Sequence, residues 1–278
     1  MEVIRYNSLS SIADIVIDLP IDYYHKSGVF IPQARGEIAH TSNWPDHCTI
    51  FIKTDLLEPS LALLKTIDVK FHLLTGSSDI FINTRKHVVS EIIQNEKILS
   101  WAGNNLRVEH AKMMTVPIGL EESQRRNRYN IARLFECDTE KDINVLATYT
   151  GRTSVKRIEF EDFLNQNIQR FDFIFRQHER LDYSNYVKQL NRSHYVLCPE
   201  GNGYDTLRLY ESILAGSIPV VLENPIMDMH RDLGCVVLQS WDQIADLPRQ
   251  PVQKIDRKLV SLSYWRDRLY EFQYHRSL

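Results

Sequence analysis

The hydrophobic residues of this chain fall into short continuous runs, separated by segments in which apolar positions recur at helical spacing. The runs are rich in β-branched and aromatic residues, which is typical of buried strands. They lie at residues 13–19, 47–52, 69–74, 143–149, 172–175, 194–198, 218–222 and 236–238. Helical spacing occurs at residues 55–65, 183–190, 207–214 and 260–272. Strands that alternate with helices predict parallel sheets with helices on both faces.

The stretch Leu197–Leu222 combines a strand end, a glycine loop, a helix and the next strand. Asp205 and Thr206 are placed to cap the helix, and Gly216 is placed to end it. The apolar positions that predict the helix are Leu207, Tyr210, Ile213 and Leu214. Glycines let backbone N–H groups approach a phosphate, and the N-terminus of a helix favours negative charge. The stretch therefore predicts a site for an anion such as a phosphate.

Arg208 and Glu211 are three residues apart and share one face of this helix. An arginine suits a phosphate, and a carboxylate can accept hydrogen bonds from both hydroxyls of a ribose, so one helix can hold a nucleotide at two points. The alternative is that the glycines only form a turn and the two charges form a surface ion pair. The loop lacks the glycines of a dinucleotide fingerprint and the Gly-Lys-Ser/Thr of a P-loop. An NAD-dependent oxidoreductase or an ATPase is therefore disfavoured.

The order of residues in this stretch resembles the signature of the exostosin-like glycosyltransferases, C-P-R-G-N-G followed by D-T-x-R-x-x-E-A-L-x-x-G-x-I-P-V-V. The matching residues are Cys198, Pro199, Gly201, Asn202, Gly203, Asp205, Thr206, Arg208, Glu211, Gly216, Ile218, Pro219, Val220 and Val221. Glu200 stands where the family usually has arginine, so one phosphate contact of the family needs another source. The resemblance implies that the matching residues from Pro199 to Glu211, together with Glu200, bind a nucleotide sugar.

A second strand-to-helix turn carries Gly151 and Arg152, and Arg157 follows in the next helix. This turn resembles the G-x-R-x-x-x-R segment of the same family, whose arginine meets the pyrophosphate of the donor. The resemblance implies that Arg152 and Arg157 contact the donor, where they could replace the arginine missing at position 200. For Arg157 the alternative is a surface charge.

The strand at residues 69–74 runs into Thr75-Gly76-Ser77-Ser78-Asp79, at the sheet edge where α/β proteins bind ligands. This segment resembles the family's S-G-D-S-D-Y stretch, and Asp79, on its second aspartate, is our candidate for the catalytic base. The alternative is that Asp79 caps the next helix. Residues 97–105 and 116–120, with His110 between them, resemble the family's W-F-A-x-N and H-x-n-x-x-P-I-G-L segments. His110 is a candidate contact to the acceptor or donor, with a structural histidine as the alternative.

Residues 22–44 are irregular and rich in aromatic side chains. Aromatic rings stack on the C–H faces of sugars, which makes Tyr23, Tyr24, His25 and Trp44 candidates for acceptor binding. The alternative is that these rings cover the core.

Composition limits the class of protein. The chain has 278 residues, of which 43% are hydrophobic and 25% charged, which is typical of a soluble globular protein with one large or two ordinary domains. A net charge of −3 disfavours a nucleic-acid partner, and no apolar run is long enough to span a membrane. The N-terminus lacks the features of a signal peptide, and Cys48, Cys137, Cys198 and Cys235 form no Cys-x-x-Cys. We therefore expect reduced thiols and a cytoplasmic location.

These observations predict two Rossmann-like α/β domains in the GT-B architecture, facing across a cleft. We expect an acceptor domain at residues 1–125, a donor domain at 126–255, and a C-terminal helix at 256–278 that returns to the first domain. The family resemblance implies an inverting glycosyltransferase that moves a sugar from a UDP-sugar, with xylose favoured, to a hydroxyl of a glycan. Asp-x-Asp, through which the other large glycosyltransferase architecture holds a metal, is absent, so we expect no metal and no other cofactor. The alternative is a non-catalytic protein that binds nucleotide sugars or glycans on the same scaffold.

Overall fold

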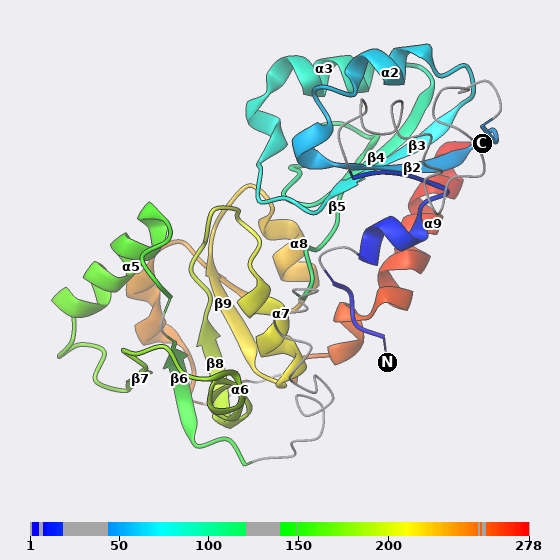
Figure 1. Ribbon diagram of the computed structural model, residues 1–278. Helices are drawn as coiled ribbons and strands as arrows, with labels where there is room; N and C mark the ends of the chain where they lie inside the picture. The colour runs from blue at the N-terminus through cyan, green and yellow to red at the C-terminus, as the bar shows by residue number, and fades with distance from the viewer. Residues whose placement is uncertain are drawn as a thin grey trace. The chain divides into compact units, whose positions relative to one another are not determined.

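The computed structural model describes residues 2–5, 8–18, 44–120, 140–148, 150–249, 251 and 254–277. The chain divides into two compact units, which Figure 1 draws. The N-terminal unit comprises Glu2–Ile118 and Leu262–Leu278, and the C-terminal unit comprises Gly119–Ser261. In the described residues each unit contains a five-stranded sheet whose paired strands all run parallel.

The sheet of the N-terminal unit has the strand order β1-β2-β3-β4-β5, which is also the order of the chain. Its strands are β1 (Ile15–Ile17), β2 (Cys48–Lys53), β3 (Phe71–Gly76), β4 (Ile98–Gly103) and β5 (Met113–Thr115). Its helices are α2 (Leu61–Thr66), α3 (Lys86–Gln94), α9 (Leu262–Ser277) and the 3₁₀ helices η1 (Ser8–Ile12), η3 (Thr54–Leu56) and η4 (Ile82–Thr84). In Figure 1, α2 and α3 lie on one side of this sheet and α9 on the other.

The last helix, α9, is fastened to the N-terminal sheet by side-chain hydrogen bonds. Gln273 Nε2 donates to Thr49 Oγ1 at 3.1 Å, and Ser277 Oγ lies 3.2 Å from His72 Nε2. His72 is buried, and its Nδ1 lies 2.8 Å from Ser100 Oγ on β4. The C-terminal end of the chain thus forms part of the N-terminal unit.

The sheet of the C-terminal unit has the order β10-β9-β8-β6-β7. Its strands are β6 (Ile143–Ala147), β7 (Ile174–Arg176), β8 (Ser193–Leu197), β9 (Ile218–Leu222) and β10 (Val236–Leu238). Its helices are α5 (Val155–Gln166), α6 (Tyr183–Arg192), α7 (Leu207–Leu214), α8 (Met227–Asp232) and the 3₁₀ helices η5 (Trp241–Asp246) and η6 (Arg257–Val260). β7 is added on one side of β6, and β8, β9 and β10 on the other. Such a reversal of strand order makes a crevice at the carboxyl ends of the strands, where open α/β sheets bind ligands.

Helix α7 packs on this sheet through Leu209, Tyr210, Ile213 and Leu214, all fully buried. The helix lies where the apolar positions predict it, and residues 209, 210, 213 and 214 form its buried stripe, while Leu207, in the first turn, is only partly buried. Gly216 ends the helix as predicted, with φ +71°. A Cβ there would also lie 2.8 Å from Arg257 Nη2, so a side chain would displace that guanidinium, and the backbone conformation favours glycine.

The prediction of two Rossmann-like α/β domains is confirmed, since two parallel five-stranded sheets with interleaved helices are consistent with GT-B. The helix predicted at residues 55–65 is interrupted, and η3 and α2 share its place. Pro59 lies between them, and proline lacks the N–H of a continuous helix and restricts the residue before it. β5 and α8 were not predicted, because both are too short to show a period.

Within the described part of the chain, no helix has the length and apolar character needed to cross a bilayer. Cys48, Cys198 and Cys235 are buried free thiols, and Cys137 lies outside the described residues.

Candidate functional site

A cavity of about 940 Å³ opens in the C-terminal unit at the switch point between β6 and β8. Its lining comes from the segments that follow β6 and β7 and from the first turns of α6 and α7. Five residues that the sequence predicts for donor binding are brought together in it: Gly151, Arg152, Arg157, Arg208 and Glu211. The volume and position are those of a site for a small organic ligand.

Glu211 is a buried carboxylate in the wall of this cavity, with 3% of its surface exposed. The hydroxyl of Tyr186, on α6, donates to Glu211 Oε2 at 2.7 Å. Burial, followed by the negative charge of Glu211, holds the pKa of Tyr186 well above its ordinary value, while the charge of Arg208 opposes the rise. Tyr186 is therefore a neutral donor that orients the carboxylate. A carboxylate has about four acceptor positions, so further hydrogen bonds from a ligand can be accepted.

The turn after β6 carries the second group of predicted residues. Gly151 has φ +65°, a conformation that glycine adopts without strain. Ser154 then caps α5, because its Oγ accepts from the backbone N–H of Arg157 at 3.3 Å. Arg157 Nη1 donates to Thr150 O at 3.2 Å and to Thr153 Oγ1 at 2.8 Å. These bonds hold the Arg157 guanidinium beside the cavity, while Arg152 is exposed in its lining.

The glycine loop after β8 meets Arg157 directly. A Cβ on Gly201 would lie 3.0 Å from Arg157 Nη2, so the guanidinium occupies the space that a side chain at this position would need. The N–H of Gly201 donates to Gly203 O at 3.2 Å, which closes the loop into a tight turn. Arg157 thus brings a positive charge against the loop in which the resembled family has its arginine.

The sequence predicts that Asp205 and Thr206 cap α7, and their side chains are arranged differently. Thr206 is the N-cap residue of α7, but its side chain makes no capping hydrogen bond, and its Oγ1 is buried with no partner among the described residues. The Asp205 carboxylate accepts a hydrogen bond from the Tyr210 hydroxyl at 2.5 Å, and its Oδ1 lies 3.6 Å from His230 Nε2. The carboxylate faces buried polar partners, and the loop is fastened to α7 and α8.

The remaining loop residues, Pro199, Glu200, Asn202 and Gly203, lie beside the cavity and not in its lining. Cys198, at the end of β8, is fully enclosed, and burial raises the pKa of its thiol to about 12. A thiol that stays protonated at neutral pH is a poor nucleophile, so Cys198 is a packing residue.

The candidates in the N-terminal unit have different surroundings. Asp79 is exposed in the loop after β3, and the N-cap residues of η4 and α3 are Phe81 and Arg85, so Asp79 caps neither helix. His110 is also exposed, and its Nδ1 accepts from the backbone N–H of Lys112 at 3.1 Å in the turn before β5. Trp44 is 4% exposed, which favours a role in the core. Tyr23, Tyr24 and His25 lie outside the described residues.

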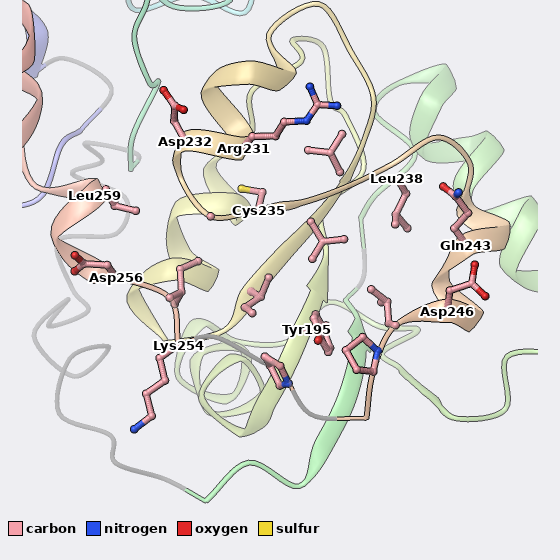
Figure 2. Close-up of a pocket in the computed structure, with 18 residues that line it drawn as sticks. Tyr195, Arg231, Asp232, Cys235, Leu238, Gln243, Asp246, Lys254, Asp256 and Leu259 are labelled. Atoms are coloured by element: carbon pink, nitrogen blue, oxygen red, sulfur yellow. The ribbon is translucent and has the colours of Figure 1, made fainter.

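A second cavity, of about 800 Å³, lies in the same unit (Figure 2). Its lining includes Tyr195, Cys235, Leu238, Lys254 and Asp256. It contains none of the residues that the sequence predicts for donor binding.

Two residues were not predicted from the sequence. Tyr186 lines the candidate site, and His230 lies beside Asp205, behind the glycine loop. Tyr186 lies 25 residues before its partner Glu211 on another helix, and His230 lies on the unpredicted helix α8. Only the parallel topology brings them to the same edge as α7. The sequence did offer one sign of Tyr186, because the residue lies near the start of a predicted helix. The start of a helix that follows a parallel strand lies at the carboxyl edge of the sheet, where ligands bind.

Residues 153–240 match the family described as RXYLT1 C-terminal domain. This span contains Arg157, the glycine loop, Arg208 and Glu211, so the match covers most of the candidate site. No curated protein matches the chain. Over residues 153–240 the chain is therefore similar to the C-terminal domain of a ribitol xylosyltransferase, an exostosin-like GT-B enzyme, which indicates a glycosyltransferase domain.

Proposed function

We propose that the protein is an inverting glycosyltransferase that moves a sugar from a UDP-sugar to a hydroxyl of a glycan acceptor. The observation that carries the proposal is the cavity at the β6–β8 switch point, whose lining includes Arg157, Arg208 and the buried carboxylate Glu211. The similarity to a glycosyltransferase domain covers the same residues.

The donor binds with its ribose hydroxyls on Glu211 and its diphosphate near Arg152, Arg157 and Arg208. Hydrogen bonds between charged partners contribute about 1.5–3 kcal/mol each, so Arg157 offsets the loss of the family's arginine at position 200. The N–H groups of the Gly201–Gly203 loop add donors that are fixed before the ligand arrives.

The reaction is a single displacement at the anomeric carbon. Asp79 takes the proton from the acceptor hydroxyl, and that oxygen forms the new glycosidic bond as the bond between the anomeric carbon and the diphosphate breaks. UDP leaves with the electron pair of that bond, and the arginines and loop amides stabilise its negative charge. We propose that this array replaces a metal ion.

Xylose is the first donor sugar to test, and ribitol belongs among the first acceptors. The family matched over residues 153–240 is that of a ribitol xylosyltransferase, whose name contains both.

The proposal is tested by thermal unfolding with UDP, GDP, CMP or NAD, each with and without EDTA. A nucleotide at a hundred times its dissociation constant adds about 2.7 kcal/mol of stability, a shift of several degrees. We expect a shift with UDP that survives EDTA and is lost in Glu211→Ala. Stabilisation by another nucleotide and not by UDP would refute the donor assignment. A UDP shift without turnover on any UDP-sugar would favour a non-catalytic binding protein.

A further inference from the structure

Glu161 is a carboxylate of α5 that does not line the cavity at the β6–β8 switch point but is bonded to a residue that does. The hydroxyl of Thr150, in the turn after β6, donates to Glu161 Oε1 at 3.1 Å. Thr150 is 6% exposed and belongs to the lining of the cavity. The other carboxylate oxygen, Glu161 Oε2, lies 3.7 Å from Nη2 of Arg176 on β7. Arg176 thus offsets the negative charge of Glu161, so that Glu161 can hold Thr150 close to a site for an anion.

Thr150 joins Glu161 to Arg157 through its two oxygen atoms. Its hydroxyl is bonded to Glu161, and its carbonyl oxygen accepts from Arg157 Nη1 at 3.2 Å. Arg157 and Glu161 are four residues apart on α5, so they lie on the same face of the helix, one turn apart. On the other side of the guanidinium, a Cβ on Gly201 would lie 3.0 Å from Arg157 Nη2. The turn after β6 therefore holds one end of the guanidinium while its other end lies against the glycine loop.

We propose that Glu161 is a positioning residue for the diphosphate of the donor. It fixes Thr150, and Thr150 fixes the Arg157 guanidinium where the diphosphate binds. This inference rests on the proposed function and adds to it a residue that does not touch the ligand. An arginine binds a phosphate best when its fork of N–H groups is already held in the right direction. Without Glu161 the Thr150 hydroxyl loses its acceptor, and the turn that presents the Thr150 carbonyl is held less firmly.

The test is equilibrium binding of inorganic pyrophosphate, UDP and uridine to the full chain and its variants. Pyrophosphate contains only the group that Arg157 is expected to contact, and uridine lacks that group. Glu161→Ala removes the acceptor of the Thr150 hydroxyl, and it should weaken pyrophosphate and UDP binding by about tenfold while uridine binding stays the same. Glu161→Gln keeps an oxygen that accepts from Thr150, so it should restore most of the affinity. A structural role alone would weaken the binding of all three ligands alike.

Thr150→Val removes the link between Glu161 and Arg157 with the least change of shape. It leaves the pair of Glu161 and Arg176 in place. It should weaken pyrophosphate binding as much as Glu161→Ala does, and it provides the measurement if Glu161→Ala fails to fold. In an Arg157→Gln background neither substitution should weaken pyrophosphate binding further, because the guanidinium on which the link acts is absent.

Glu159→Ala is the matched control, since Glu159 is another carboxylate of α5. Glu159 Oε2 lies 3.2 Å from Lys156 Nζ, and both side chains are exposed. The substitution removes the same charge from the same helix and leaves the bond between Thr150 and Glu161. The affinities for pyrophosphate, UDP and uridine should therefore remain.

The outcomes separate this inference from the proposed function. The inference is overturned if Glu161→Ala and Thr150→Val leave pyrophosphate binding unchanged, if they weaken uridine binding as much, or if their effect persists in the Arg157→Gln background. If the unmodified protein binds pyrophosphate but not UDP, the proposed function fails, and the pyrophosphate series still decides whether Glu161 positions Arg157. If the unmodified protein binds neither, both the function and the inference are refuted.

Discussion

Replacing Tyr186 by phenylalanine tests whether Glu211 is a carboxylate oriented for a ligand. The substitution removes the only atom that donates from Tyr186 to Glu211 Oε2, at 2.7 Å, and leaves the ring in place. Glu211 is 3% exposed, so water replaces the lost donor poorly. A hydrogen bond to a charged group contributes about 1.5–3 kcal/mol, and a neutral one about 0.5–1.5 kcal/mol.

A double-mutant cycle separates this bond from the general cost of changing Tyr186. Tyr186→Phe should lower the free energy of unfolding by about 1.5–3 kcal/mol in the unmodified protein, and by about 0.5–1.5 kcal/mol in a Glu211→Gln background. The coupling between the two sites is then about 1–1.5 kcal/mol. At roughly 2–4 °C per kcal/mol, Tyr186→Phe alone should shift the melting temperature by about 3–12 °C.

The assay is denaturant and thermal unfolding of the four proteins, followed by UDP titration of each. Because Tyr186 orients the carboxylate, its loss should also weaken UDP binding by about tenfold. Tyr274→Phe on α9 is the control, since Tyr274 is 62% exposed and its hydroxyl can be lost at less than about 0.5 kcal/mol. A change below about 0.5 kcal/mol from Tyr186→Phe in both backgrounds would refute the argument that the phenol holds the carboxylate.

Three further predictions concern the base, the loop and the response to pH. Asp79→Asn should reduce turnover by about 10²-fold or more and leave the UDP dissociation constant unchanged; intact turnover removes Asp79 from the base role. Gly201→Ala should displace the Arg157 guanidinium and weaken UDP binding by about tenfold; unchanged binding would show that this contact plays no part in it. Burial lowers the pKa of His72 from 6.5 to about 4, so between these values the unfolded chain binds a proton that the folded chain does not. The free energy of unfolding should therefore fall as the pH drops through this window, by about 3 kcal/mol at pH 4, and His72→Gln should flatten the dependence in urea titrations; an unchanged slope would exclude His72 as its source.

Eight of the ten described strands were predictable because they are continuous apolar runs, whereas β4 and β5 were not predicted. β9 and β10 begin and end at the predicted residues, since each run is flanked by polar or glycine-containing segments. α8 could not be predicted, because six residues are too few to show a helical period. The buried side of α7 was only partly predictable. Leu207 and Leu209 are equally apolar, and the position of the helix start decides which of them faces the sheet.

The residues of the site were predictable only where they share one element. Arg208 and Glu211 lie three apart on α7, so their common face follows from helical geometry alone. The contact of Arg157 with Gly201 joins α5 to the loop after β8, and the bond from Tyr186 to Glu211 joins α6 to α7. Such contacts depend on the strand order, which hydrophobic periods do not encode.

The departure at position 200 shows why the site must be considered as a set of charges and not as a motif. A glutamate in a phosphate-binding loop would by itself argue against an anionic ligand. Arg157 reaches the same loop from α5, and its guanidinium occupies the space over Gly201. The Glu200 side chain is partly buried beside it, and burial raises the pKa of its carboxyl group. The charge that a ligand meets at this loop therefore depends on residues from several elements, and the glutamate at position 200 does not by itself exclude an anion.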